Sequence, residues 1–393
     1  MNHIFILGSH PTWSVAEIGA MFGFDDLTWS KEHILIKDQF DLNAETLIRR
    51  LGGTLKIAQV ELVLDINTSF LQLAKNSAKI ISAKAKRGEG KLIFGLSDYG
   101  VSGRFSAEKL GLQIKKEFKQ QNISSRLVTS REKELSSVVV GQNKLLTKGA
   151  ELIFYSDNNK IVIARTLAIQ DYKDLSRRDY GRPARDDHSG MLPPKLAQMM
   201  INITQQNELN SLLLDPFCGS GTIIHEAMLL GYSNLLGTDL SAKAIQDSRT
   251  NTSWMKDLYS LDVFPHFHIK NATRLHQFLK KDSVTSIVTE PYLGPQRGLK
   301  DIALIKDELQ TLYQQALSSF SQILKKQGRI VMVWPVFFGQ EFLDLNLGDW
   351  RLVKLIPDKF LELEWVKLSH RDTLLYHRPG QKVWRELIVL EKK

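Results

Sequence analysis

The strongest constraint on the fold is one stretch, L-L-L-D-P-F-C-G-S-G-T-I-I-H-E-A, which occupies residues 212–227. An apolar run ends at Asp215, small residues follow, and a helical pattern begins at Gly221. Glycines let backbone amides approach a ligand closely, and a helix N-terminus favours negative charge nearby. The stretch therefore predicts a strand, a ligand-binding turn and a helix that opens at the turn.

This unit is part of a longer alternation of strands and helices. From residue 196 the pattern predicts, in order, a helix to residue 203, a strand at 212–214, the helix from Gly221, a strand at 235–238 and a helix at 242–251. Such alternation indicates a parallel sheet that is covered on both faces. Residues 374–390 predict two antiparallel strands, turned at Pro379 and Gly380, that close the sheet. The expected fold class is α/β, with a doubly wound domain at residues 196–393.

A second acid limits the kinds of ligand that the turn can be expected to bind. Asp239 lies 24 residues after Asp215, at the end of the next predicted strand, where a carboxylate can accept both hydroxyls of a ribose. A helix N-cap is the alternative for Asp239 taken alone. The turn matches neither G-x-G-x-x-G nor the phosphate loop that ends in Gly-Lys-Ser/Thr. By itself it suits a dinucleotide, a phosphate or S-adenosylmethionine. A further strand-like run ends at Asn271, where an adenine amino group can be read.

A third acid follows the apolar run 284–288, in the stretch V-T-E-P-Y-L-G-P at residues 288–295. Glu290, Pro291 and Tyr292 follow the carboxyl end of a predicted strand, and therefore lie beside the turn.

The amino-terminal part of the chain has a different pattern. Residues 1–170 predict an α+β region, in which Ser14 followed by Glu17 predicts a capping box at a helix start. Residues 171–195 lack periodicity and predict a linker. Residues 74–187 carry 23 basic and 13 acidic side chains, a net charge of +10. This charge suits a ligand with a phosphate backbone, because neutralised phosphates release counterions, although a solvated basic face would look the same.

Composition excludes several other classes. No run reaches the roughly 18 unbroken apolar residues of a membrane span, and residues 1–10 lack the pattern of an export signal, so we expect a cytoplasmic protein with no membrane partner. The single cysteine, Cys218, allows neither an internal disulfide nor a thiolate cluster. It has no adjacent base, which favours packing over nucleophilic catalysis. The histidines show no metal-binding spacing, so no metal site is predicted.

Three motifs together resemble a known family. D-P-F-C-G-S-G-T at 215–222, G-T-D-L-S at 237–241 and the loop at 290–292 resemble the S-adenosylmethionine-dependent methyltransferases that modify exocyclic amines, specifically the THUMP-domain RNA methyltransferases. The stretches at 177–187, 190–204 and 5–23 are similar to segments of the tRNA guanosine-10 N2-methyltransferases. That family has Asp or Asn followed by two prolines in its catalytic loop, whereas this chain has Glu290 and one proline.

The resemblance implies a fold, a reaction and a set of site residues. The fold would be a Rossmann-like methyltransferase domain at 196–393, preceded by an RNA-binding region at 1–170 that contains a THUMP domain. The reaction would be methyl transfer from S-adenosylmethionine to guanosine N2 of tRNA or another structured RNA. Glu290, Pro291 and Tyr292 would be catalytic. The cofactor would contact Asp215, Pro216, Phe217, Cys218, Gly219, Ser220, Gly221, Asp239, Leu240, Asn271 and Ala272.

Two questions stay open in the sequence. Arg178, Tyr180 and Arg182 in the linker fit contact with the substrate or with the cofactor carboxylate, but the arginines could equally form an ion network with neighbouring acids. A DNA adenine or cytosine amino-methyltransferase would share the carboxy-terminal half. A protein that binds RNA without modifying it would share the whole fold.

Overall fold

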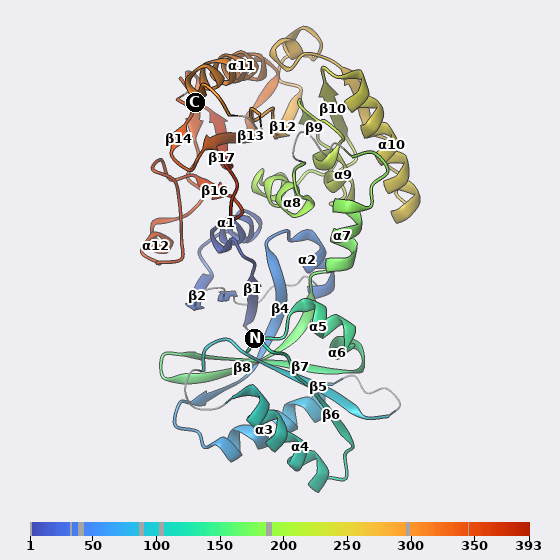
Figure 1. The fold of residues 1–393 in the computed structure, drawn as a ribbon, viewed down its shortest axis with the longest axis vertical. Coiled ribbons are helices and arrows are strands. Elements are labelled where there is room, and N and C mark those ends of the chain that lie inside the picture. The colour runs from blue at the N-terminus through green and yellow to red at the C-terminus, as the bar shows by residue number, and fades with distance from the viewer. Residues whose placement is uncertain are drawn as a thin grey trace. The chain divides into compact units, whose positions relative to one another are not determined.

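The computed structural model describes residues 2–31, 34–37, 43–85, 90–101, 106–185, 191–295, 299–344 and 346–393. Its internal contacts divide the chain into two compact units, which are described separately (Figure 1). The first unit comprises Met1–Pro11, Asp25–Arg50 and Thr54–Lys173. The second comprises Thr12–Phe24, Leu51–Gly53 and Asp174–Lys393.

The first unit contains an eight-stranded sheet in the order β2-β3-β1-β4-β8-β7-β5-β6. Strand β5 runs parallel to β6 and β7, and the other neighbours are antiparallel. The strands are β1 (His3–Leu7), β2 (Leu27–Lys31), β3 (Ile34–Lys37), β4 (Thr54–Asp65), β5 (Leu92–Asp98), β6 (Ser125–Val128), β7 (Gly149–Asp157) and β8 (Lys160–Ile169).

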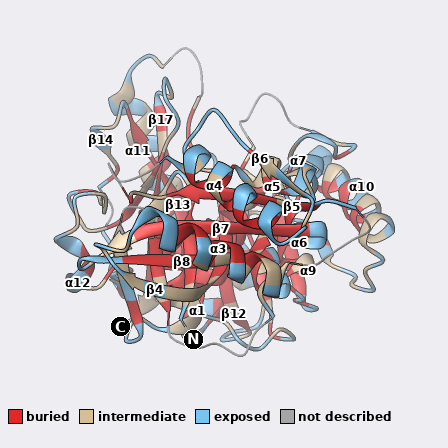
Figure 2. Cartoon of the chain, turned by 90° about the horizontal axis from the view of Figure 1, so that it is seen from below, coloured by how far each residue is buried: buried red, intermediate tan, exposed pale blue. Residues whose placement is uncertain are grey.

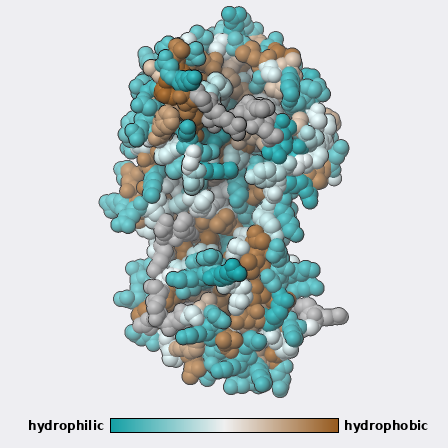
Figure 3. Space-filling model, viewed as in Figure 1, coloured by the Kyte–Doolittle hydropathy of each residue, from teal (hydrophilic) through white to brown (hydrophobic). Residues whose placement is uncertain are grey.

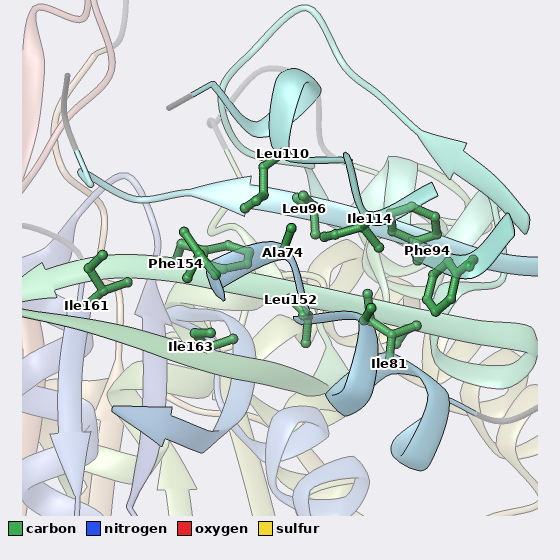
Figure 4. Close-up of a cluster of buried hydrophobic side chains, with 14 of the residues drawn as sticks. Ala74, Ile81, Phe94, Leu96, Leu110, Ile114, Leu152, Phe154, Ile161 and Ile163 are labelled. Carbon is green, nitrogen blue, oxygen red and sulfur yellow. The ribbon is translucent and has the colours of Figure 1, made fainter. Parts of the chain in front are cut away.

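Helices α3 (Phe70–Lys84) and α4 (Ala107–Gln120) pack against each other and against this sheet. Figure 4 shows Leu110 and Ile114 of α4 in one apolar cluster with side chains from α3 and the strands. The exposed sides of α3 and α4 contrast with the buried strands β7 and β8 in Figure 2. The shorter helices are α2 (Ala44–Arg50), α5 (Ser137–Gln142) and α6 (Leu145–Lys148).

The second unit contains a nine-stranded sheet in the order β11-β10-β9-β12-β13-β17-β15, with β14 paired to β13 and β16 to β17. The strands from β11 to β13 are parallel and β17 is antiparallel, so the doubly wound α/β fold expected from the sequence is confirmed. The strands are β9 (Leu213–Asp215), β10 (Leu235–Asp239), β11 (His266–Ile269), β12 (Val284–Thr289), β13 (Leu324–Phe337), β14 (Glu341–Phe342), β15 (Trp350–Leu352), β16 (Leu374–Tyr376) and β17 (Val383–Lys392).

Helices connect these strands and pack on the sheet. Helices α9 and α10 contact β10, and α8 and α11 contact β13. The helices are α8 (Pro194–Ile203), α9 (Thr222–Leu229), α10 (Ala242–Tyr259), the 3-10 helix η1 (Ala272–Gln277), α11 (Ile302–Ile323) and α12 (Asp358–Leu361). The expected linker contains helix α7 (Tyr172–Tyr180), and its residues 186–190 lie outside the described part.

The amino-terminal helix α1 (Pro11–Phe22) groups with the second unit from Thr12 onward. Trp13 is buried and its Nε1 donates to the carbonyl oxygen of Leu375, at 2.9 Å. The predicted domain boundary at residue 170 therefore leaves out a part of the second unit, because that part comes from the start of the chain. The sequence pattern of α1 predicts a helix, but it does not show which unit the helix packs against.

The sequence predicted a capping box of Ser14 and Glu17 at a helix start, but α1 begins at Pro11 and both residues lie inside it. The two carboxylate oxygens of Glu17 accept from the amides of Gly52 and Gly53, each at 2.8 Å, and Asn202 Nδ2 also donates to Oε1 at 2.8 Å. The hydroxyl of Ser14 donates to the carbonyl of Gly53. These contacts join three segments that are distant in the sequence.

Replacing Glu17 with glutamine is expected to weaken the pH dependence of stability. Burial raises the pKa of Glu17 to about 7, against an ordinary value of 4.5, even though three hydrogen bonds oppose the shift. The folded state thus favours the protonated form of Glu17. Its contribution to the free energy of unfolding is present below pH 4.5 and is lost as the pH rises through 7. For one such group the loss is about 3 kcal/mol. Urea midpoints at pH 5 and pH 8 measure it.

The matched control for Glu17→Gln is Glu45→Gln, which changes an exposed carboxylate in the first turn of α2. We expect the midpoint difference between the two pH values to shrink in Glu17→Gln and to stay at the wild-type value in Glu45→Gln. An unchanged difference in Glu17→Gln would show that Glu17 is ionised in the folded protein well below pH 7.

Within the described residues, no helix is long and apolar enough to cross a membrane. The face of the molecule in Figure 3 is largely hydrophilic, with dispersed hydrophobic patches.

Candidate active site

A cavity of about 670 Å³ lies at the carboxyl ends of the parallel strands in the second unit. Strands β9 and β12 are neighbours at the centre of the sheet. From β9 the chain continues to β10 on one side, and from β12 it continues to β13 on the other. Doubly wound sheets bind their ligands at such a switch point. Most residues predicted for the site line this one cavity. They are Asp215, Pro216, Phe217, Cys218, Gly219, Ser220, Asp239, Leu240, Asn271, Ala272, Glu290, Pro291 and Tyr292.

The loop between β9 and α9 has the tight turn that its glycines predict. Gly219 and Gly221 have φ of +52° and +92°, a region that favours glycine. A Cβ on Gly221 would lie 2.6 Å from the imidazole of His225, so no larger residue fits without a shift. The amide of Gly221 donates to the carbonyl of Cys218, at 2.8 Å. Gly221 thus shapes the loop, although it does not line the cavity itself.

Cys218 packs in the loop and is not placed for nucleophilic chemistry. Its side chain is buried, and burial raises the pKa of its thiol well above the usual value, with the charges of Asp215 and Asp239 adding to the effect. A thiol is nucleophilic only as the thiolate. The structure therefore supports the packing role expected from the sequence.

Asp239 connects the end of β10 to the loop. Its Oδ2 accepts from the amide of Gly219 at 3.0 Å, and its Oδ1 accepts from the amide of Ser241 at 2.8 Å. Each carboxylate oxygen has two acceptor positions, so both oxygens can still accept from a ligand. Binding a pair of ribose hydroxyls, which the sequence predicts for Asp239, would use one acceptor position on each oxygen.

Asp215 joins the two strands at the centre of the site. It is buried, and its Oδ1 accepts from Thr289 Oγ1 at 2.7 Å and from the amide of Phe217 at 3.2 Å. Burial raises the pKa of Asp215 to about 7, and the charges of Asp239 and Glu290 act in the same direction. The hydrogen bonds hold the loop against the end of β12, which carries the Glu290 loop.

Two residues of α10 support the loop and were missed in the sequence. Ser248 Oγ donates to the carbonyl of Gly219 at 2.7 Å, and Asn251 Nδ2 donates to the carbonyl of Ser220 at 3.0 Å. Asn251 also pairs with both backbone groups of Ala184 in the linker. The sequence did contain a signal for this support: two polar residues, three positions apart, on the side of a helix that faces the protein interior.

Asn271 follows β11 and begins η1. Its Oδ1 accepts from the amide and from the hydroxyl of Thr273, at 3.0 and 2.9 Å. These contacts use the oxygen and fix the plane of the side-chain amide. Because Asn271 and Ala272 also line the cavity, their placement agrees with the prediction that they lie beside the base of a nucleoside.

The Glu290 carboxylate is held by an arginine that the sequence did not point to. Arg385 of β17 donates from Nε to Oε2 at 2.6 Å and from Nη2 to Oε1 at 2.9 Å. The two side chains are only 7% and 10% exposed, respectively. Tyr292, in contrast, is 58% exposed, and its carbonyl accepts from the hydroxyl of Tyr313 at 2.7 Å. The loop thus has a fixed acid and an exposed aromatic ring.

The predicted substrate contacts of the linker arginines need correction. Arg178 is buried and donates from Nε to Glu226 at 2.8 Å, and its Nη1 also contacts Asp174. It belongs to the ion network that was the alternative, because its guanidinium is already paired inside the unit. Arg182 is also buried, with Nη1 donating to Thr222 Oγ1 at 2.7 Å behind the loop.

Tyr180 lies apart from these two arginines. It is exposed, and the guanidinium of Arg185 lies 5.5 Å from the centre of its ring. None of the three predicted linker residues lines the cavity. Of the three, only Tyr180 is accessible for a contact with a large ligand.

The strand order, the loop at 215–221 and Asp239 define a Rossmann-like, S-adenosylmethionine-dependent methyltransferase fold. Residues 182–336 match the family model described as RMKL-like, methyltransferase domain, and residues 62–250 match the model described as DNA methylase. The crystal structure of TrmN from Thermus thermophilus superposes over the whole of both chains, with a TM-score of 0.57 and 16% identity. This likeness confirms the fold.

Curated relatives confirm the resemblance that the motifs showed. The chain is 26% identical over 183 residues to a tRNA (guanine(10)-N2)-dimethyltransferase of Methanocaldococcus jannaschii, which is 44% of this chain and 48% of the relative. It is 28% identical over 170 residues to the enzyme of the same name from Pyrococcus abyssi, which is 43% and 44% of the two chains. The chain thus spans about half the length of the curated relatives it matches.

Proposed function

We propose that this protein transfers a methyl group from S-adenosylmethionine to an exocyclic base amine of tRNA, most specifically guanosine N2. One observation carries the proposal: Glu290 and Tyr292 lie in the lining of the same cavity as the loop at 215–221 and Asp239. An acid and an aromatic ring beside a nucleoside site are what methylation of a base amine needs. The names of the curated relatives give the substrate.

The residues of the cavity suit this cofactor. Asp239 offers acceptors to the ribose, Asn271 lies where the adenine would be bound, and the loop offers backbone groups to the remainder. When bound, S-adenosylmethionine supplies a methyl group on a positively charged sulfur.

The substrate half of the site has a separate task. Glu290 would accept hydrogens of the target amine, which raises the electron density on nitrogen. The target base has to leave its stacked position in the RNA to reach the cavity. Tyr292 would then stack on the extruded base. Leu240, which follows Asp239 and also lines the cavity, would contact the cofactor.

We further propose that residues 1–170 contain the THUMP domain and bind the RNA, and that the protein acts in the cytoplasm. The basic residues of 74–187 support this role. Lys109, Lys115 and Lys119 are exposed on α4, where they can contact phosphates. Phosphate contacts position a nucleic acid but do not read its sequence. The choice of nucleotide would therefore depend on the catalytic cavity.

Incorporation of labelled methyl from S-adenosylmethionine into unmodified tRNA tests the proposal, with duplex DNA in a parallel reaction. We expect label in tRNA alone, and nucleoside digestion should locate it on guanosine N2. Label in DNA would favour a DNA amino-methyltransferase, which the DNA methylase match keeps as the second candidate. No label in either, with cofactor binding confirmed, would mean that the protein binds RNA without modifying it.

Replacing Tyr292 with alanine is expected to lower kcat/KM for tRNA by about 10- to 100-fold, because stacking on one base contributes about 1–3 kcal/mol. Tyr292→Phe keeps the ring and should retain most activity. The affinity for S-adenosylhomocysteine, measured by calorimetry, should be the same in both variants. Equal losses in Tyr292→Ala and Tyr292→Phe would assign the effect to the hydroxyl and not to stacking.

A further inference from the structure

The contact between Glu290 and Arg385 links two segments that are 95 residues apart in the sequence. Glu290 follows β12, Arg385 lies in β17, and β13 lies between these two strands in the sheet. Both nitrogens of the guanidinium edge face both oxygens of the carboxylate, at 2.6 and 2.9 Å. This paired geometry is the most directional that an ion pair can have.

The charges of Glu290 and Arg385 are both largely shielded from water, so each depends on the other for stabilisation. Removing one member of a buried ion pair leaves the other uncompensated, which is strongly unfavourable. The attraction of Glu290 raises the pKa of Arg385 against the opposing effect of burial, so the guanidinium stays charged. Glutamate has one more rotatable bond than aspartate, and the paired contact restricts that freedom.

We propose that Arg385 is a positioning residue, which holds the Glu290 carboxylate at the cavity as a hydrogen-bond acceptor. This inference rests on the proposed function and deepens it. Arg385 uses one acceptor position on each oxygen, and a second position on each oxygen remains for the amine hydrogens. Glu290 then acts by accepting hydrogen bonds and not by removing a proton as a base.

The reaction balances under this assignment. The amine lone pair forms the new nitrogen–carbon bond, the carbon–sulfur bonding pair stays with sulfur, and the proton that the nitrogen releases goes to water. Without Arg385, the Glu290 side chain can take other rotamers, and its oxygens would leave the position from which they accept the amine hydrogens.

The test compares Arg385→Gln and Arg385→Lys with Arg371→Gln. Arg371 makes the same kind of paired contact with Glu386, at 2.8 and 2.6 Å, and Glu386 is the residue next to Arg385 in β17. Arg371→Gln therefore breaks a similar ion pair without changing Glu290. The measurements are kcat and KM for tRNA at pH 7, the affinity for S-adenosylhomocysteine and the melting temperature.

We expect Arg385→Gln to lower kcat at pH 7 by about 100-fold, with cofactor affinity unchanged, because a misplacement of about 1 Å has an effect of this size. KM for tRNA should change much less than kcat, because Arg385 acts on the position of Glu290 and not on RNA binding. Arg385→Lys should recover part of the rate. A loss of kcat no larger than that of Arg371→Gln would overturn the inference.

A second readout does not depend on activity. In protein labelled with ¹³C at the glutamate carboxyl, the signal of Glu290 can be assigned by its absence in Glu290→Gln. We expect one sharp signal in the wild type and a shifted or broadened signal in Arg385→Gln, because the carboxylate loses its fixed position. That result, in a protein that methylates neither tRNA nor DNA, would overturn the proposed function but keep the role of Arg385. An unchanged signal in Arg385→Gln would overturn the role of Arg385.

Discussion

Replacing Glu290 with alanine is expected to lower kcat for tRNA methylation by about 100- to 10,000-fold, the range that a positioned acid or base contributes. The amine would lose its acceptor while the opposite wall of the cavity, with Asp215 and Asp239, stays intact. Binding of S-adenosylhomocysteine should therefore persist. Steady-state kinetics with labelled methyl and calorimetry measure the two quantities separately.

Glu290→Ala also leaves the buried Arg385 without its partner, so a loss of folding must be separated from a loss of chemistry. Glu290→Gln keeps the size of the side chain and one acceptor oxygen, and it should be partly active. Glu341→Ala is the control, because it removes an exposed carboxylate that pairs with Lys306 at 2.9 Å. Wild-type turnover in Glu290→Ala would assign the acid's role to another residue.

Replacing Asp239 with alanine is expected to weaken the binding of S-adenosylhomocysteine by about 100-fold or more. Two hydroxyl groups would lose hydrogen bonds to a carboxylate, and such bonds contribute about 1.5–3 kcal/mol each. The amides of Gly219 and Ser241 would also lose their acceptor, which loosens the loop that forms one wall of the cavity. Titration calorimetry gives the change in affinity directly.

Asp257→Ala is the matched control, since Asp257 is an exposed carboxylate on α10, the helix that follows Asp239. Its affinity for the cofactor product should equal that of the wild type. Asp239→Asn keeps the shape and one acceptor oxygen, and should lie between the two. Equal affinity in Asp239→Ala and in the wild type would show that the ribose is bound elsewhere.

Much of the site could be predicted from local sequence. The positions of Asp215, Asp239 and Glu290 at strand ends follow from short apolar runs, and parallel strands bring their carboxyl ends to one edge. The structure places these residues around one cavity, while their individual roles stay predictions. Gly219 and Gly221 were also readable, because a tight turn with positive φ requires glycine.

Other parts could not be predicted, because they depend on contacts between distant segments. Arg178 looked available for a substrate, yet it is paired with Glu226 inside the unit. Glu17 looked like a helix cap, yet it binds Gly52 and Gly53. Charged side chains in a linker or at a helix start look alike in the sequence, whether they face water or a partner.

Local sequence is enough to locate the strands and helices, the loop at 215–221 and the acids at the strand ends, since each of these depends on a few neighbouring residues and on the periodicity of strands and helices. The contacts of α1 with the second unit and of Arg385 with Glu290 become visible only in the folded chain. A buried charge finds its partner through the order of the strands in the sheet. That order is set by packing of the whole unit, not by local sequence.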